Sequence, residues 1–137
     1  MNTIIVGYDE TDPARRALDR AAMLAQKLGA ELVVTSVAPI ATGSPRGGVG
    51  VDPADSLEEH EAELQRALEV LRTAGLTADS VPAVGDPAEA IVELAEARGA
   101  DLIVVGSRSI GAIKRLLGQS VSDAVAHQAR CDVLIVH

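Results

Sequence analysis

Apolar runs about the length of a β-strand alternate along this chain with amphipathic stretches of helical spacing. Residues 2–8, NTIIVGY, are unbroken by any charged residue, which is typical of a strand buried on both faces of a parallel sheet. Further segments predict four more strands, at residues 31–37, 79–84, 101–105 and 131–136. Pro82 lies inside the third strand and places it at a sheet edge, because proline cannot donate to a ladder of hydrogen bonds.

The stretches between these strands carry the signals of helix ends. Asp12 and Pro13 predict an N-cap and a first-turn proline, and Gly29 predicts the end of the same helix. Ser56 belongs to a capping box that opens a second helix, and Asp86 caps a third. A fourth amphipathic stretch precedes the last strand, so strand and helix alternate along the whole sequence.

This alternation predicts an α/β fold in which helices cover both faces of a sheet. We expect a three-layer sandwich with a five-stranded parallel sheet and right-handed crossovers, formed as a single domain by residues 1–137. Residues 41–55 are rich in glycine and proline and show no period, so they are expected to form a flexible lid loop.

The charge balance narrows the choice of partners. Twelve Lys and Arg residues against 20 Asp and Glu residues give a formal net charge of −8. This acidity argues against the broad electrostatic grip that nucleic acids or anionic membranes require, so neither is expected as a partner. The first residues lack both a basic leader and an apolar stretch of export length, and we therefore expect a cytoplasmic protein.

Rare residue types exclude several kinds of site. Tyr8 is the only aromatic residue, which argues against a flavin or base held between stacked rings. Cys131 is the only cysteine, so we expect no intrachain disulfide and interpret it as a small core residue. His60, His127 and His137 lack the spacing of metal ligands and are expected at the surface.

The most informative segment follows the fourth predicted strand, because ligands of parallel sheets bind outside the carboxyl ends of the strands. Residues 106–122 contain three glycines and four serines and run into a predicted helix, and residues 106–130 carry four basic residues against one acidic residue. Small residues and a helix N-terminus can hold a phosphate with backbone N–H groups. The same composition also fits a plain connection between a strand and a helix, with Ser120 as its cap.

Three longer segments resemble the universal stress protein family: IIVGYDETDPARRALDRA, VGDPAEAIVELAEARGADLIVVGSRS and RLLGQSVSDAVAHQARCDVLIVH. The resemblance implies the adenine nucleotide alpha hydrolase-like fold with strand order 3-2-1-4-5. It also implies binding of an adenine nucleotide, namely ATP, ADP, AMP or cyclic AMP, with Mg²⁺ as a companion ion. A homodimer through the fifth strand is expected as well, formed by Val133, Leu134, Ile135 and Val136.

Nucleotide-binding members of that family carry the pattern G-x2-G-x9-G-[ST] after the fourth strand. Here Gly106 and Ser120 match its first and last positions, whereas Ser109 and Gln119 replace the second and third glycines. Gly118 lies one residue before the third and restores the space if the loop is shifted. The nucleotide site that the resemblance implies comprises Asp9, Thr11, Val37, Gly106, Ser107, Arg108, Ser109, Gly118, Gln119, Ser120, Val121 and Ser122.

Two of these positions lie outside the glycine pattern. Asp9 resembles the carboxylate that accepts hydrogen bonds from the ribose, and Val37 resembles the residue whose backbone reads the edge of the adenine. Each also has a plainer interpretation, because Asp9 could serve only the turn before the first helix and Val37 could serve only core packing. The basic residues Arg108, Lys114 and Arg115 could likewise form a solvated face.

Enzymatic functions find little support in the sequence. The only carboxylates near the expected site are Asp9 and Glu10, and the P-loop, GxSxG and GxGxxG motifs are absent. No aspartate ends the third strand, which excludes a response-regulator receiver. We therefore expect no catalytic residue and at most slow ATP hydrolysis. Two hypotheses remain: a nucleotide-binding regulatory module of the stress response, or a nucleotide-independent dimeric scaffold of the same family with a degenerate phosphate loop.

Overall fold

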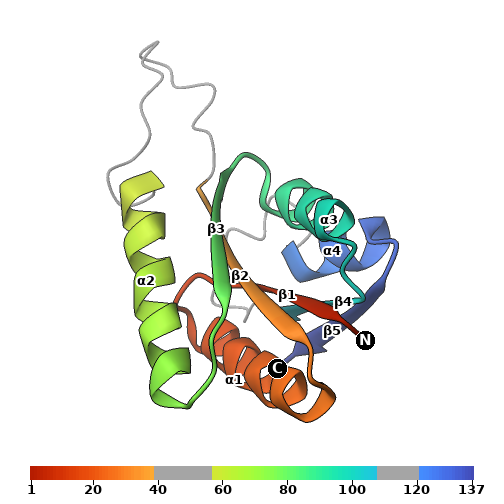
Figure 1. Ribbon diagram of the computed structural model, residues 1–137. Helices are drawn as coiled ribbons and strands as arrows, with labels where there is room; N and C mark the ends of the chain where they lie inside the picture. The colour runs from red at the N-terminus through yellow and green to blue at the C-terminus, as the bar shows by residue number, and fades with distance from the viewer. Residues whose placement is uncertain (39–56, 108–120) are drawn as a thin grey trace.

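The computed structural model describes residues 1–38, 57–107 and 121–137, and its centre is a sheet of five parallel strands (Figure 1). The strands are β1 (Thr3–Gly7), β2 (Glu31–Ala38), β3 (Asp79–Val84), β4 (Leu102–Gly106) and β5 (Asp132–Val136). Their order is β3-β2-β1-β4-β5, with every neighbouring pair parallel. The predicted α/β class and the strand order implied by the resemblance are both confirmed.

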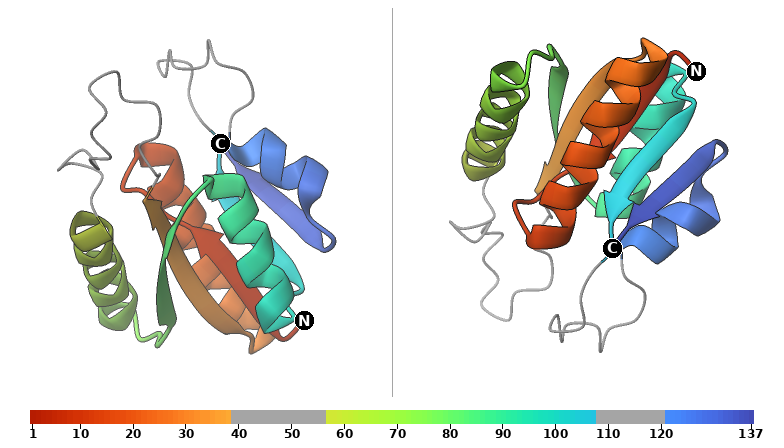
Figure 2. Two further views of the ribbon diagram at one scale, coloured as in Figure 1. Left: turned by 90° about the horizontal axis from the view of Figure 1, so that it is seen from above. Right: turned by 90° about the horizontal axis from the view of Figure 1, so that it is seen from below.

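Helices cover both faces of this sheet in the described part of the chain. They are α1 (Asp12–Leu28), α2 (Leu57–Thr73), α3 (Pro87–Arg98) and α4 (Val121–Gln128). Figure 2 shows α3 and α4 over the sheet from one side and α1 across it from the other, with α2 on the same face as α1. The expected three-layer sandwich is therefore present.

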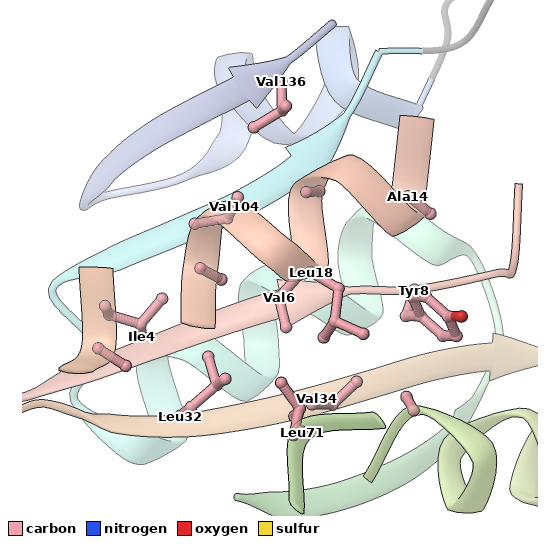
Figure 3. Close-up of a cluster of buried hydrophobic side chains, with 14 of the residues drawn as sticks. Ile4, Val6, Tyr8, Ala14, Leu18, Leu32, Val34, Leu71, Val104 and Val136 are labelled. Atoms are coloured by element: carbon pink, nitrogen blue, oxygen red, sulfur yellow. The ribbon is translucent and has the colours of Figure 1, made fainter. Parts of the chain in front are cut away.

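The central strand β1 explains why its sequence is apolar without a break. Ile4 and Val6 belong to the core between the sheet and α1 and α2, whereas Ile5 belongs to the core under α3 and α4. All three side chains are fully buried, and each contributes about 1.5–3 kcal/mol relative to an exposed position. In Figure 3, Ile4 lies at one end of the first core and the ring of Tyr8 lies at the other.

The capping residues are largely those that the sequence predicts. The Asp86 carboxylate accepts a hydrogen bond from the Glu89 N–H at 3.0 Å, which confirms the predicted cap of α3. The cap of α1 is Thr11 rather than Asp12, so that prediction was wrong by one residue. The backbone of Thr11 is still extended, and its Oγ1 accepts from the Ala14 N–H at 3.3 Å, whereas Asp12 is already helical.

The two edges of the sheet are β3 and β5. Pro82 lies on β3, as predicted for a proline at a sheet edge. The expected lid at residues 41–55 lies outside the described residues. Among the helices that the structure describes, none combines the length and the apolar character that crossing a membrane requires.

Candidate functional site

A cavity of about 240 Å³ lies at the carboxyl ends of β1, β2 and β4. In the sheet, β1 lies between β2 and β4. The chain runs from β1 outward to β2 and β3 on one side and later to β4 and β5 on the other, so the strand order reverses at the end of β1. The described residues that line the cavity are Gly7, Tyr8, Asp9, Thr11, Ala14, Thr35, Val37, His60, Pro87, Ile91, Val105, Gly106, Ser107 and Val121.

Half of the site residues named from the sequence meet at this cavity. They are Asp9, Thr11, Val37, Gly106, Ser107 and Val121. Ser122 is buried in the first turn of α4 and is not among the lining residues. The other predicted positions lie outside the described residues: Arg108, Ser109, Gly118, Gln119 and Ser120.

The turn after β1 fixes the carboxylate of Asp9 at the cavity. Its Oδ1 accepts hydrogen bonds from the Thr11 N–H at 3.1 Å and from the Thr11 hydroxyl at 2.6 Å. The same Thr11 hydroxyl caps α1 through the Ala14 N–H. The cap of α1 is therefore Thr11 and not Asp9, and Thr11 also holds the Asp9 carboxylate.

Glu10 follows Asp9 in the sequence but is not among the residues that line the cavity. Its φ of 63° lies in the left-handed region, which costs about 1–3 kcal/mol for a residue with a side chain. The Glu10 carboxylate accepts two hydrogen bonds from Arg66 of α2, at 2.7 and 3.0 Å. This paired contact lowers the pKa of Glu10, and it ties the β1–α1 turn to α2.

The end of β4 forms another part of the cavity wall, next to the first turn of α1. A Cβ atom at Gly106 would lie 2.4 Å from the carbonyl carbon of Pro13, so only glycine fits against the first turn of α1. The Ser107 N–H donates to the Val136 carbonyl at 2.8 Å and therefore belongs to the sheet. The expected phosphate cradle cannot use this N–H group. Its members within residues 108–120 lie outside the described part, whereas Val121 and Ser122 lie in the first turn of α4.

A buried polar cluster adjoins the β2 side of the cavity. The Ser36 hydroxyl donates to Glu63 Oε1 at 3.0 Å, and its oxygen lies 2.5 Å from His60 Nδ1. His60 Nδ1 is also 3.0 Å from Glu63 Oε1. Burial raises the pKa of Glu63, although the Ser36 hydroxyl and His60 act in the opposite direction.

His60 was expected at the surface, and this prediction was wrong. Only 7% of the residue is exposed. It precedes Leu64, Ala67 and Leu71 on the buried face of α2, at the helical spacing that those apolar residues share. That spacing is the signal in the sequence for a buried His60, whereas the absence of metal-ligand spacing carries no information about burial.

Further lining residues carry no motif that sequence reasoning could have used. Thr35 points its hydroxyl across the sheet to the Val81 carbonyl at 2.7 Å. Tyr8 is 7% exposed, and burial raises the pKa of its hydroxyl. Tyr8 and Thr35 line the cavity because the fold brings the ends of β1 and β2 together.

The cavity combines apolar walls with a few fixed polar groups. Val37, Ile91 and Val105 supply apolar surface, and the Asp9 carboxylate supplies an acceptor. Such a combination suits a small organic ligand with hydroxyl groups. Among residues 1–38, 57–107 and 121–137, no group of three or more His, Cys, Asp or Glu side chains is arranged to hold a metal ion.

Comparison with known proteins agrees with the fold. The model of the universal stress protein family matches residues 1–137. The chain is 34% identical over 145 residues to the universal stress protein YxiE of Bacillus subtilis, and the match covers 98% of each protein.

Solved structures are similar over the same extent. One is a universal stress protein in complex with cAMP, with a TM-score of 0.78 and 34% identity, covering 99% of this chain and 97% of that one. Another is the universal stress protein of Archaeoglobus fulgidus in complex with dAMP, with a TM-score of 0.75 and 25% identity, covering 100% of this chain and 98% of that one.

Proposed function

The chain belongs to the universal stress protein family, and from this premise we propose that it binds an adenine nucleotide in the cavity at the ends of β1, β2 and β4. The observation that carries the proposal is the meeting of Asp9, Thr11 and Val37 with Gly106 in one cavity. Two similar proteins of known structure hold cAMP and dAMP. The protein would serve as a regulatory module of the stress response in the cytoplasm.

The positions of the strand ends give the proposed ligand its orientation in the cavity. The base would lie near Val37 on β2, and the ribose would lie at Asp9, where the carboxylate accepts from its hydroxyls. The phosphates would point past Gly106 toward the segment that follows β4. Mg²⁺ would be held by the phosphates together with water, as this ion prefers.

Calorimetric titration of the full chain with AMP, ADP, ATP and cyclic AMP tests this function. At protein concentrations of about tens of micromolar, we expect saturable heat with at least one of the four ligands. The absence of heat with all four would favour the second candidate, a nucleotide-independent dimeric scaffold. The observation that favours the scaffold is that the Ser107 N–H is already bonded to Val136 and unavailable to an anion.

We also propose that the chain forms a homodimer through the exposed edge of β5. The Val136 carbonyl faces β4, where it accepts from Ser107. Because consecutive residues of a strand turn their N–H and C=O groups to opposite edges, those of Val133 and Ile135 face away from the sheet. An apolar edge whose N–H and C=O groups are unpaired among the described strands is a template for pairing with a second copy.

A further inference from the structure

We propose that His60 distinguishes the base of the bound nucleotide, with its Nε2 atom accepting a hydrogen bond from the 6-amino group of a purine. The inference rests on the proposed nucleotide site and deepens it. It assigns specificity to a residue of α2 that lies outside every motif named from the sequence.

The first observation is an unsatisfied atom. His60 lines the cavity, yet its side chain is more than nine-tenths buried. Its Nδ1 is engaged by Ser36 and Glu63, whereas its Nε2 has no hydrogen-bond partner within the part of the chain that the structure describes. A buried polar atom without a partner destabilises the fold unless a ligand or a water satisfies it.

The second step concerns the proton on the imidazole ring. The Ser36 hydroxyl has one hydrogen, and it donates this hydrogen to the Glu63 carboxylate. The Ser36 oxygen and the Glu63 carboxylate therefore both face His60 Nδ1 as acceptors, at 2.5 and 3.0 Å. These acceptors favour the tautomer with hydrogen on Nδ1, which leaves the lone pair on Nε2.

The third step places the His60 side chain at the base end of the proposed site. His60 contacts Ser36, which precedes Val37 on β2, and β2 is the strand at which the base would lie. The ribose and phosphates lie toward β1 and β4 in the proposed arrangement. Adenine offers an amino hydrogen at position 6, whereas hypoxanthine and guanine offer a carbonyl oxygen there. An acceptor at Nε2 therefore favours adenine.

The test compares AMP with IMP, which differ at position 6 of the base. We expect wild-type protein to bind AMP roughly tenfold or more tightly than IMP, the size of effect expected for one well-placed hydrogen bond. His60→Asn places an amide near the Nδ1 position beside Ser36 and removes Nε2. We expect this variant to lose affinity for AMP and to lower the AMP-to-IMP preference by roughly tenfold.

A matched control is His127→Asn. His127 is exposed on α4 and is not among the cavity residues, so the AMP-to-IMP preference should stay as in the wild type. His60→Gln extends an amide toward the Nε2 position. An amide can present either its oxygen or its NH₂ group, so we expect this variant to bind AMP and IMP with similar affinity.

Nitrogen NMR of the wild-type imidazoles gives a readout that does not depend on any variant folding. We expect the Nε2 signal of His60 to be that of an unprotonated nitrogen and to shift when AMP is added, with His127 as an unshifted reference. A protonated Nε2, or a signal that AMP leaves unchanged, would overturn the inference.

The binding outcomes separate the inference from the proposed function. If AMP and IMP bind the wild type and His60→Asn weakens both equally, His60 only packs, and the inference fails while the nucleotide site stands. If neither ligand binds the wild-type protein, and ADP, ATP and cyclic AMP also give no heat, the proposed function and the inference fall together.

Discussion

A Cβ atom on Gly106 would lie 2.4 Å from the carbonyl carbon of Pro13 and 2.5 Å from its oxygen. The end of β4 therefore touches the backbone of the first turn of α1, and these two segments form neighbouring parts of the cavity wall. Because the contacted atoms are backbone, they cannot rotate away as a side chain would. Gly106 is therefore required for packing between β4 and α1, whatever ligand the cavity holds.

Gly106→Ala should destabilise the fold. The added methyl group must displace the start of α1 or the end of β4, and overpacking of this kind costs about 1–3 kcal/mol in the free energy of unfolding. Urea unfolding followed by circular dichroism measures the change. The matched control is Gly7→Ala, because its Cβ would meet only side-chain atoms, at 3.0 Å from Ile91 and 3.4 Å from Val105. Equal stability losses for the two variants would contradict the backbone contact.

The ion pair between Glu10 and Arg66 should make stability depend on pH. Arg66 lowers the pKa of Glu10 from its ordinary value of 4.5 in the folded state. The stabilisation is therefore present above about pH 4.5 and is lost as the pH falls through the lower folded-state pKa. Glu10→Gln keeps the backbone and the shape but removes the charge, so its deficit in stability should shrink over that acidic range.

Unfolding free energies of Glu10→Gln and wild type, measured from about pH 3 to pH 7, give this profile. Glu93→Gln, a change on the exposed side of α3, controls for the loss of one negative charge from an acidic protein. A deficit of Glu10→Gln that stayed constant or grew toward low pH would show that the pair with Arg66 does not act as the structure indicates.

Thr11 should influence both helix stability and nucleotide affinity. Its hydroxyl caps α1 and holds the Asp9 carboxylate. Thr11→Val keeps the size and removes the hydroxyl, so we expect a loss of about 1 kcal/mol in stability. We also expect weaker binding of AMP, because Asp9 would no longer be held for the ribose. Thr11→Ser keeps the hydroxyl and should retain both properties in chemical unfolding and calorimetry.

Substitution of Asp9 tests its proposed contact with the ribose directly. Asp9→Ala removes the acceptors proposed for the ribose hydroxyls, so it should weaken AMP and ATP to a similar extent, by roughly tenfold or more. Calorimetry measures both affinities. Unchanged affinity for both nucleotides would mean that Asp9 serves only the turn before α1.

The sequence was sufficient for the sheet, because burial on both faces leaves a direct trace in composition. Strand β1 could be predicted from residues such as Ile4 and Ile5, which lie on opposite faces and must both be apolar. The cap at Asp86 was predictable because its hydrogen bond reaches only three residues along the chain. Interactions that are local in sequence, or repeated at every strand, can be recognised before the structure is known.

The polar cluster at the cavity was not predicted, because its members come from different elements. Ser36 lies on β2, and His60 and Glu63 lie one turn apart on α2. Nothing in the sequence around Ser36 indicates that an imidazole lies 2.5 Å away. The separation of Asp9 from Glu10 was also hidden, because it depends on the left-handed backbone of Glu10 and its contact with Arg66.

The proposed dimer can be tested at a single N–H group. Val133 lies on β5 between residues that bond to β4, and its N–H faces the open edge. Val133→Pro removes this donor and adds a ring at the edge, a position at which a strand tolerates proline. We expect the variant to keep its circular dichroism spectrum and to shift from dimer to monomer in light scattering.

Leu134→Pro is the matched comparison, because the N–H of Leu134 faces β4 and its side chain packs in the core beside α1. This variant should lose the β4–β5 ladder and unfold, whereas Val133→Pro should lose only the partner. If Val133→Pro remained a dimer of wild-type strength, the contact between copies would have to use another surface. If the wild-type protein were itself a monomer at the same concentration, the edge of β5 would not pair at all.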